Sequence, residues 1–339
     1  MMIESNDDIQ GASAAAAHIP AEFPPPAIDG PKRQHYLPRF YLEGFTKDGF
    51  LAVYDRESNE LRLQKPENTG VIGHFYTMED DQGRKRFEVE QMLSDVEGKA
   101  GPIIRKLAAK ADITAEERAD FAVFLALALV RTPDMIDSVK MVNADMVKLM
   151  TQVAVADVER AKASIRRRPG APTSEEELEK KATELVEFVQ ADQYKITTNH
   201  RWAVGIAVAQ FPVIASILGD RDWLVLHRDS EKRSFVTADA PLVLTTVEPR
   251  ENNFYGVGFA NADALVMFPL TDACTILIFG SDGGLRHETI GPEQIRRMNL
   301  MVADRCQRFV IGRDEALVRS LANRLGLGKK KWRPKMSAS

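Results

Sequence analysis

The sequence has few cysteines and no long hydrophobic run, and each of these absences excludes a class of protein. Only two cysteines occur in 339 residues, Cys274 and Cys306, which is too few for a disulfide framework or a cysteine-rich zinc site. The longest apolar run, residues 121–130, is about half as long as the roughly 20 residues that a membrane-spanning helix needs. We therefore expect a soluble, cytoplasmic protein that makes no contact with a membrane.

An excess of basic charge and the common enzyme motifs are also missing. The chain has 45 Lys+Arg against 49 Asp+Glu, a formal net charge of -4, so the overall charge indicates neither a nucleic-acid nor a membrane partner. It contains no Gly-x-Gly-x-x-Gly, no phosphate-loop lysine motif, no His-Glu-x-x-His and no Gly-x-Ser-x-Gly. The usual signatures of dinucleotide-binding, zinc-peptidase and serine-hydrolase proteins are therefore absent.

The two ends of the chain have a biased composition. Residues 1–30 hold runs of alanine and proline, and we expect a disordered leader, because little surface there could be buried to offset the entropy of ordering. Residues 328–339 are expected to be a basic disordered tail. Phosphate neutralisation and base stacking by this tail would suit single-stranded nucleic acid, through Lys329, Lys330, Lys331, Trp332 and Arg333. A solubilising end with no partner is the alternative.

Between the ends, the hydrophobic period changes twice. Residues 49–64 alternate as in a β-hairpin, and residues 87–218 repeat at the three- and four-residue steps of helices. Short β-like runs fill residues 219–312, and further helices close the chain. This order predicts an α+β fold with an N-terminal hairpin, a central helical bundle and a C-terminal, mainly antiparallel sheet with closing helices. We expect residues 31–327 to form a single domain.

Residues 35–45 are the densest unusual segment. They combine the imidazole of His35 and the guanidinium of Arg39 with four aromatic rings. One interpretation makes His35 a ligand or an acid/base and Arg39 an anion clamp. The other is structural: the two side chains cap and brace an N-terminal turn against the helices.

Four further residues carry charges that a fold must accommodate. Glu90 and Glu97 are seven residues apart, so a helix places them on nearly the same meridian, about 10 Å apart along its axis. Arg131 follows the all-apolar run and must reach water or a carboxylate, so an Arg–Glu network is the structural alternative to a site. Asp239 follows a β-run two positions before a proline, where carboxylates serve either as site residues or as turn formers.

The motif His-Tyr-Leu-Pro-Arg-Phe-Tyr-Leu at residues 35–42, followed by Phe45, resembles the opening of a bacterial family of proteins of unknown function, DUF4238. The likeness covers residues 32–312. It continues through the segments 74–76, 90–97, 131–133, 235–241, 268–271 and 299–310. Where that family typically has Ser-Asp-x-Pro, this chain has Ala-Asp-Ala-Pro. The resemblance implies one continuous domain and no particular activity.

We expect the charged residues singled out above to converge in one polar cluster. The candidate catalytic residues are His35, Arg39, Glu90, Glu97, Arg131 and Asp239. Such a set fits a hydrolase acting on a phosphate-containing substrate or nucleic acid, with the arginines stabilising developing charge. The sequence specifies no cofactor, although carboxylates and an imidazole are also ligands for a divalent metal ion. The alternative is a non-catalytic binding or interaction module in which the polar cluster is structural.

Overall fold

The computed structural model describes residues 29–192, 194–248 and 257–329, with the side chain of Lys329 left out. The predicted tail residues Lys330, Lys331, Trp332 and Arg333 and nearly all of the predicted leader lie outside these ranges. The chain divides into two compact units, described here separately: residues 29–132 with 208–329, and residues 133–207. One domain over residues 31–327 therefore stays a prediction.

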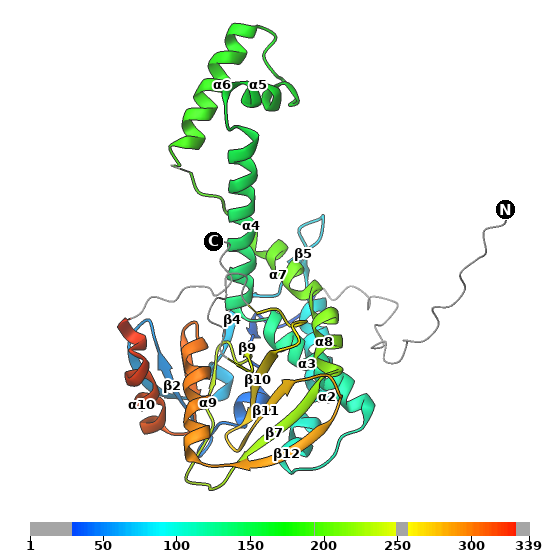
Figure 1. Cartoon of the computed structure of the whole chain (residues 1–339), viewed down its shortest axis with the longest axis vertical. Coiled ribbons are helices and arrows are strands. Elements are labelled where there is room, and N and C mark those ends of the chain that lie inside the picture. Colours follow the sequence, from blue (N-terminus) through cyan, green and yellow to red (C-terminus); the bar gives the residue numbers. More distant parts are fainter. Residues whose placement is uncertain (1–28, 193, 249–256, 330–339) are drawn as a thin grey trace, which may run out of the picture. The chain divides into compact units, whose positions relative to one another are not determined.

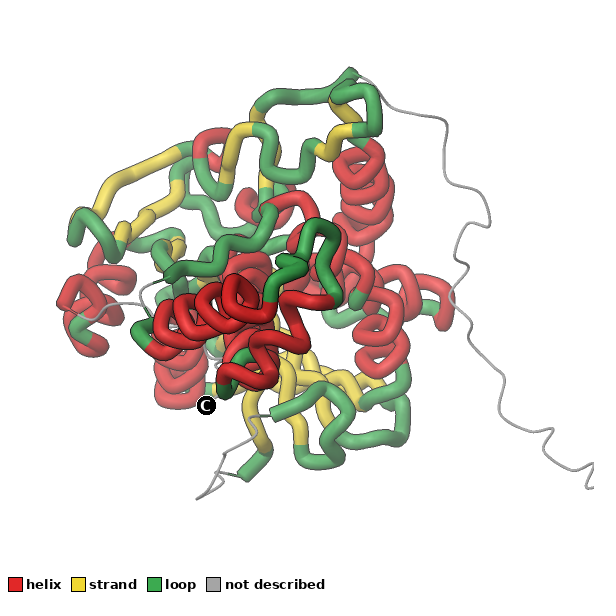
Figure 2. The backbone as a smooth tube through the Cα atoms, turned by 90° about the horizontal axis from the view of Figure 1, so that it is seen from above, coloured by secondary structure: helices red, strands yellow, loops and turns green. Residues whose placement is uncertain are grey.

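The fold is α+β, as the sequence predicts. Figure 2 shows that helices and strands both contribute substantially to the chain. The sheets are antiparallel except for one pair of strands. The alternating segment at residues 49–64 forms the expected hairpin of β2 (Leu51–Asp55) and β3 (Glu60–Gln64).

A four-stranded sheet in the larger unit joins the two ends of the described chain. Its strand order is β3-β2-β13-β8, where β8 is Thr237–Ala238 and β13 is Phe309–Gly312. Helices α9 (Pro292–Arg305) and α10 (Glu315–Leu325) pack against it. Buried apolar side chains of the strands and both helices form one core, which includes Tyr54, Val236, Val302, Val310 and Leu321.

The second large sheet has the order β12-β7-β11-β10-β9, and Figure 1 shows most of its strands as adjacent arrows. Its strands are β7 (Asp222–Arg228), β9 (Val243–Thr246), β10 (Ala264–Thr271), β11 (Cys274–Phe279) and β12 (Leu285–Ile290). Only β12 and β7 pair in parallel. Both cysteines of the chain are free and buried.

Helix α3 (Ala115–Val130) is the centre of the helical layer in this unit. The Thr114 hydroxyl accepts a hydrogen bond from the Glu117 amide, and the Glu117 carboxylate accepts one from the Thr114 amide, so the two residues form a capping box. The helix packs against α2 (Glu88–Ala108) and α8 (Phe211–Gly219). Its Phe124 ring meets Phe268 of β10 at 6.0 Å between ring centroids. Contacts on several sides explain why residues 121–130 are almost entirely buried.

Short elements at the start of the chain complete the larger unit. They are β1 (Arg33–His35), α1 (Arg39–Glu43), the 3-10 turn η1 (Pro66–Asn68), β4 (Val71–Gly73), β5 (Met78–Glu79) and β6 (Lys85–Arg86). β1 pairs with β4 and β5 with β6, both antiparallel. A further 3-10 turn, η2 (Leu327–Lys329), ends the described chain.

The smaller unit is helical. It contains the long helix α4 (Pro133–Ala154), α5 (Val158–Arg166) and α6 (Glu175–Gln190), and α7 (His200–Ala209) begins in it. α5 packs against α6 around a small apolar core that includes Ala161, Ala182 and Val186. The buried ammonium of Lys162 pairs with Glu179 at 2.9 Å, and two more glutamates share it. Helices expected in one central bundle are thus divided between the two units.

One described helical stretch, His200–Gly219, is long and apolar enough to cross a membrane by length and composition. A single stretch of this kind is weak evidence, because a core helix of a soluble protein has the same composition.

Candidate functional site

Arg131 is the centre of a polar cluster in the larger unit. Its guanidinium is buried, and its Nη1 donates a hydrogen bond of 2.7 Å to Oε1 of Glu97. Its Nη2 donates to the backbone carbonyl of His35. The Tyr76 ring lies 5.9 Å from the guanidinium carbon, and the Tyr76 hydroxyl donates to the carbonyl of Arg131. We call His35, Tyr76, Glu90, Glu97 and Arg131 the Arg131 cluster.

The helix C-terminus places Arg131 in the cluster. Arg131 is the residue directly after α3, and its amide still donates to Leu127 at 3.0 Å. The preceding turns of α3 are apolar and buried, so the side chain leaves the core at the point where it can meet a carboxylate. Glu90 and Glu97 come from one face of α2, which packs against α3.

A tight turn fixes the backbone of His35. β1 pairs His35 with Val71 of β4, and the next amide, that of Tyr36, donates to the Gly70 carbonyl at 2.8 Å. Gly70 has a φ of +68°, and a Cβ there would lie 2.8 Å from the Leu37 side chain. Only glycine fits both conditions, so this position determines how closely the His35 strand approaches Arg131.

Gln34 of β1 holds Tyr76, which lies in the turn after β4, in position. The Gln34 side chain is fully buried, its Oε1 accepts from the Tyr76 amide at 2.7 Å, and its Nε2 donates to Thr77 at 3.2 Å. A buried amide that is hydrogen-bonded on both sides holds the turn rigidly. The sequence analysis did not select Tyr76 as a site residue, because this anchoring is non-local.

Burial and nearby charges shift the pKa values of two groups in the Arg131 cluster. Burial raises the pKa of Glu90 to about 6; the charge of Arg131 opposes this shift and that of Glu97 adds to it. Burial lowers the pKa of His35, although the charge of Glu97 acts the other way. Glu90 therefore exchanges its proton close to neutral pH, whereas His35 is a neutral imidazole there.

Three buried polar atoms of the cluster have no hydrogen-bond partner among the described residues. They are Nε2 of His35, Oε2 of Glu90 and Nε of Arg131. Leaving a buried donor or acceptor unpaired costs about 1–3 kcal/mol. The cluster is therefore incompletely satisfied by the protein, and a ligand with donors and acceptors could complete it.

Two of the predicted site residues lie elsewhere. Arg39 does not join the cluster: its side chain is 62% exposed and pairs with Glu43 one helical turn away, at 3.0 Å. Asp239 is buried, and its two carboxylate oxygens accept from the amides of Gln307 at 2.9 Å and Arg308 at 2.6 Å. These bonds fasten the turn before β13 to the end of β8, which is a long-range structural contact and not the local turn weighed for Asp239.

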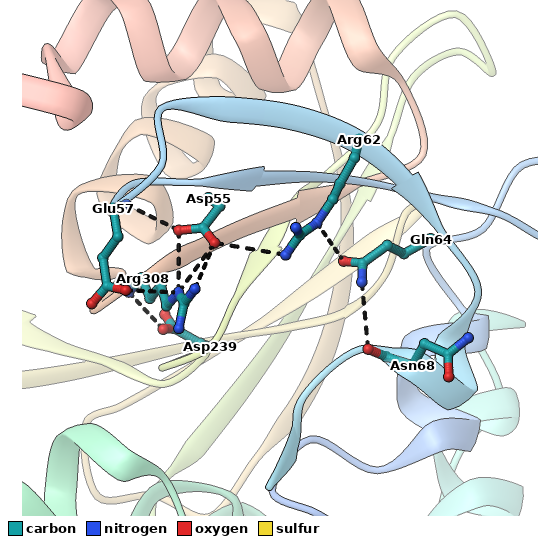
Figure 3. Close-up of polar contacts among 7 residues, drawn as sticks. All are labelled: Asp55, Glu57, Arg62, Gln64, Asn68, Asp239 and Arg308. Carbon is teal, nitrogen blue, oxygen red and sulfur yellow. Dashed lines mark hydrogen bonds and ion pairs between the residues drawn. The ribbon is translucent and has the colours of Figure 1, made fainter.

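Figure 3 shows that Asp239 belongs to a second polar network, which the sequence analysis did not anticipate. At its centre, Arg308 donates to both oxygens of the buried Asp55, with Nη2 2.9 Å from Oδ2. Burial alone would raise the pKa of Asp55, but the hydrogen bonds from Arg308 and from the Glu57 amide lower it below its usual range. We call Asp55, Asp239 and Arg308 the Asp55 network. It ties β2, β8 and the turn before β13 together, which indicates a structural role.

Tyr36 lies within electrostatic reach of both networks. Burial raises the pKa of its hydroxyl, and the nearby groups of Asp239 and Tyr76 raise it further. The Tyr36 ring packs at 6.4 Å from Phe75, measured between centroids.

Comparison with known families matches residues 33–316 to the model of the family described as "Protein of unknown function (DUF4238)". The matched range covers most of the chain. The chain belongs to this family. No curated protein and no solved structure matches it. The match includes every residue of the Arg131 cluster and of the Asp55 network, but the family description names no activity.

The described residues include no group of three or more His, Cys, Asp or Glu side chains that could hold a metal ion. In the Arg131 cluster, the charge that faces Glu90 and Glu97 is instead the guanidinium of Arg131. An arginine of this kind is suited to binding anions, and groups such as Glu90 and His35 are suited to exchanging protons.

Proposed function

We propose that this chain is a cytoplasmic hydrolase that acts on a phosphate-containing substrate at the Arg131 cluster. One observation carries the proposal: His35, Glu90 and Arg131 each present a buried polar atom that no described protein group satisfies. Buried groups of this kind are uncommon in folded proteins and require a reason. A bound substrate with anionic oxygens and a water molecule would supply the missing partners.

Each side chain has a definite part in this proposal. Arg131 keeps its charge at every relevant pH and would stabilise the negative charge that develops on a phosphoryl oxygen. Glu90 would take the proton of the attacking water as the bond from phosphorus to the leaving oxygen breaks, because its pKa of about 6 lets it ionise just below neutral pH. The leaving oxygen would then take up a proton from Glu90 or from solvent water. Neutral His35 would accept or orient a second hydrogen bond through Nε2. Glu97 would position Arg131 through their 2.7 Å hydrogen bond.

The experiment is a hydrolysis assay on the purified full-length chain. The panel would contain a phosphate monoester, a phosphate diester, nucleoside triphosphates and single-stranded nucleic acids, each tested with and without a chelator. We expect turnover of at least one substrate and a loss of about 100-fold or more in Glu90→Gln, the usual size of a general-base effect. Glu116→Gln, at an exposed position of α3 outside the cluster, is the matched control and should retain full activity.

A second candidate is a non-catalytic module that binds a partner. The pairing of Arg131 with Glu97 and with the His35 carbonyl favours it, because these bonds also join α2, α3 and β1 as a scaffold would. The basic residues 329–333 would then supply the binding surface for single-stranded nucleic acid. Removing residues 328–339 separates the two candidates: a binding module loses its partner, whereas a hydrolase keeps its turnover.

A further inference from the structure

The larger unit has an open cavity of about 670 Å³ that contains none of the Arg131 cluster. It is bordered by the first turns of α9 and α10, the loop after β7 and the turn before β2. Three acidic side chains line it against five basic ones, which are Lys47, Lys232, Arg233, Arg296 and Arg313. The cavity is therefore lined by an excess of positive charge.

Most of this charge is not neutralised within the protein. Of the five basic side chains, only Arg313 forms an ion pair with a described residue, to Asp272 at 2.5 Å. One of the acids, Asp314, is committed to the cap of α10, where it accepts from the Leu317 amide at 2.8 Å. Four exposed cations around one hollow repel each other, and an anionic ligand between them would relieve the repulsion.

The lining also includes a buried, hydrogen-bonded side chain, that of Asn299. Asn299 is 1% exposed; its Oδ1 accepts from the Val236 amide at 3.0 Å, and its Nδ2 donates to the Ser234 carbonyl at 2.9 Å. Arg228 donates to the Arg233 carbonyl at 3.0 Å and holds the loop from the other side. The loop that carries the basic residues is therefore held in place before any ligand binds, as is usual for small-molecule sites.

We propose that this cavity binds a small molecule that carries two or more phosphate groups. Its volume lies within the range of about 300–1,000 Å³ typical of small-molecule sites. Guanidinium groups match phosphate oxygens two at a time, and cations from four separate segments suit a chain of phosphates better than a single anion. The amides at the start of α9, which has no side-chain cap, add to the same positive field.

Calorimetric titration of the full-length chain tests the proposal. The ligands are inorganic pyrophosphate, inorganic triphosphate, a nucleoside triphosphate and, for comparison, sulfate. The test variant is Lys232→Gln with Arg296→Gln, which removes two lining charges. The matched variant is Arg297→Gln with Arg319→Gln, which removes two exposed charges from α9 and α10, the helices that border the cavity, without altering the lining.

We expect the polyphosphates to bind and the test variant to bind them at least about 10-fold more weakly, since each lost contact is a charge-assisted hydrogen bond. The matched variant should keep its affinity within about threefold. Tighter binding of the nucleoside triphosphate than of inorganic triphosphate would identify a nucleotide as the ligand, and equal binding would identify the phosphate chain alone. The proposal is overturned if no polyphosphate binds, if sulfate binds equally well, or if both variants weaken binding equally. Because none of these residues belongs to the Arg131 cluster, this result and the hydrolysis assay are independent.

Discussion

The charge of Glu90 provides the sharpest test of whether the Arg131 cluster is a functional site. Burial raises the pKa of Glu90 from 4.5 to about 6, so at pH 7.5 the protein holds an ionised carboxylate where water solvates it poorly. The difference of about 1.5 in pKa corresponds to at most about 2 kcal/mol. Glutamine keeps the shape and removes the charge. We therefore expect Glu90→Gln to raise the free energy of unfolding at pH 7.5 by up to that amount, and the unfolding temperature by about 4 °C.

This stabilisation should depend on pH with a definite sign. Because the folded-state pKa of Glu90 lies above the unfolded value, the protonated carboxyl stabilises the fold below pH 4.5, and this stability is lost as the pH rises through 6. Glu90→Gln and the unaltered chain should therefore unfold alike below about pH 4.5 and differ fully above pH 6. Urea denaturation followed by circular dichroism across this range measures the difference.

Glu97→Gln is the contrasting variant on the same helix face. Glu97 accepts from the buried Arg131 at 2.7 Å, so removing its charge leaves a guanidinium incompletely paired. We expect a loss of about 2 kcal/mol, less than for a fully buried pair because the Glu97 side chain is 24% exposed. If Glu90→Gln destabilises the protein at pH 7.5 as Glu97→Gln does, then both glutamates are scaffold and the functional interpretation of Glu90 is wrong.

Two further predictions concern stability alone. Nε2 of His227 lies 3.0 Å from Nδ1 of His287, and burial, with the charges of Lys110 and His287, lowers the pKa of His227 to about 4. The free energy of unfolding should therefore fall as the pH drops from 6.5 towards 4, by at most about 3 kcal/mol. His227→Phe should remove most of this pH dependence, as measured by denaturation curves, and an unchanged pH dependence would contradict the assignment to His227. Asp55→Asn should lower the free energy of unfolding by about 2 kcal/mol, because the charged acceptor of Arg308 is lost; a loss below about 0.5 kcal/mol would show that the network contributes little.

Local signals in the sequence predicted the fold class well. The apolar run at residues 121–130 lies in the segment where the sequence predicts helices, and it forms the buried second half of α3. The apolar spacing in α4 was a weaker guide. Met146 and Leu149 follow a helical stripe, yet they are 56% and 61% exposed, because periodicity shows which side chains share a face and not whether another element covers it.

The candidate site was predictable only in part, for the same reason. Glu90 and Glu97 share a face by helical geometry, and Arg131 had to reach either water or a carboxylate because an apolar helix precedes it. Tyr76 depends on a buried hydrogen bond from Gln34, 42 residues earlier, and no local pattern reports such a contact. The pairing of Arg39 with Glu43, by contrast, is the ordinary spacing of a helical ion pair and could have been read from the sequence.

The structure also bears on why an arginine is buried at this position at all. A scaffold of α2, α3 and β1 could be held by apolar side chains of similar volume, which stabilise proteins as well as buried ion pairs do or better. Three unpaired polar atoms, at about 1–3 kcal/mol each, make the cluster an expensive way to join three elements. In the same unit, the buried carboxylate of Asp55 accepts hydrogen bonds from several donors of Arg308 and from the Glu57 amide. The two clusters of this unit therefore differ in how completely their buried polar atoms are paired. Tyr194 and His287 also carry a buried polar atom without a partner among the described residues, but only around Arg131 do three such atoms come from one cluster, and this concentration is why we propose a ligand there.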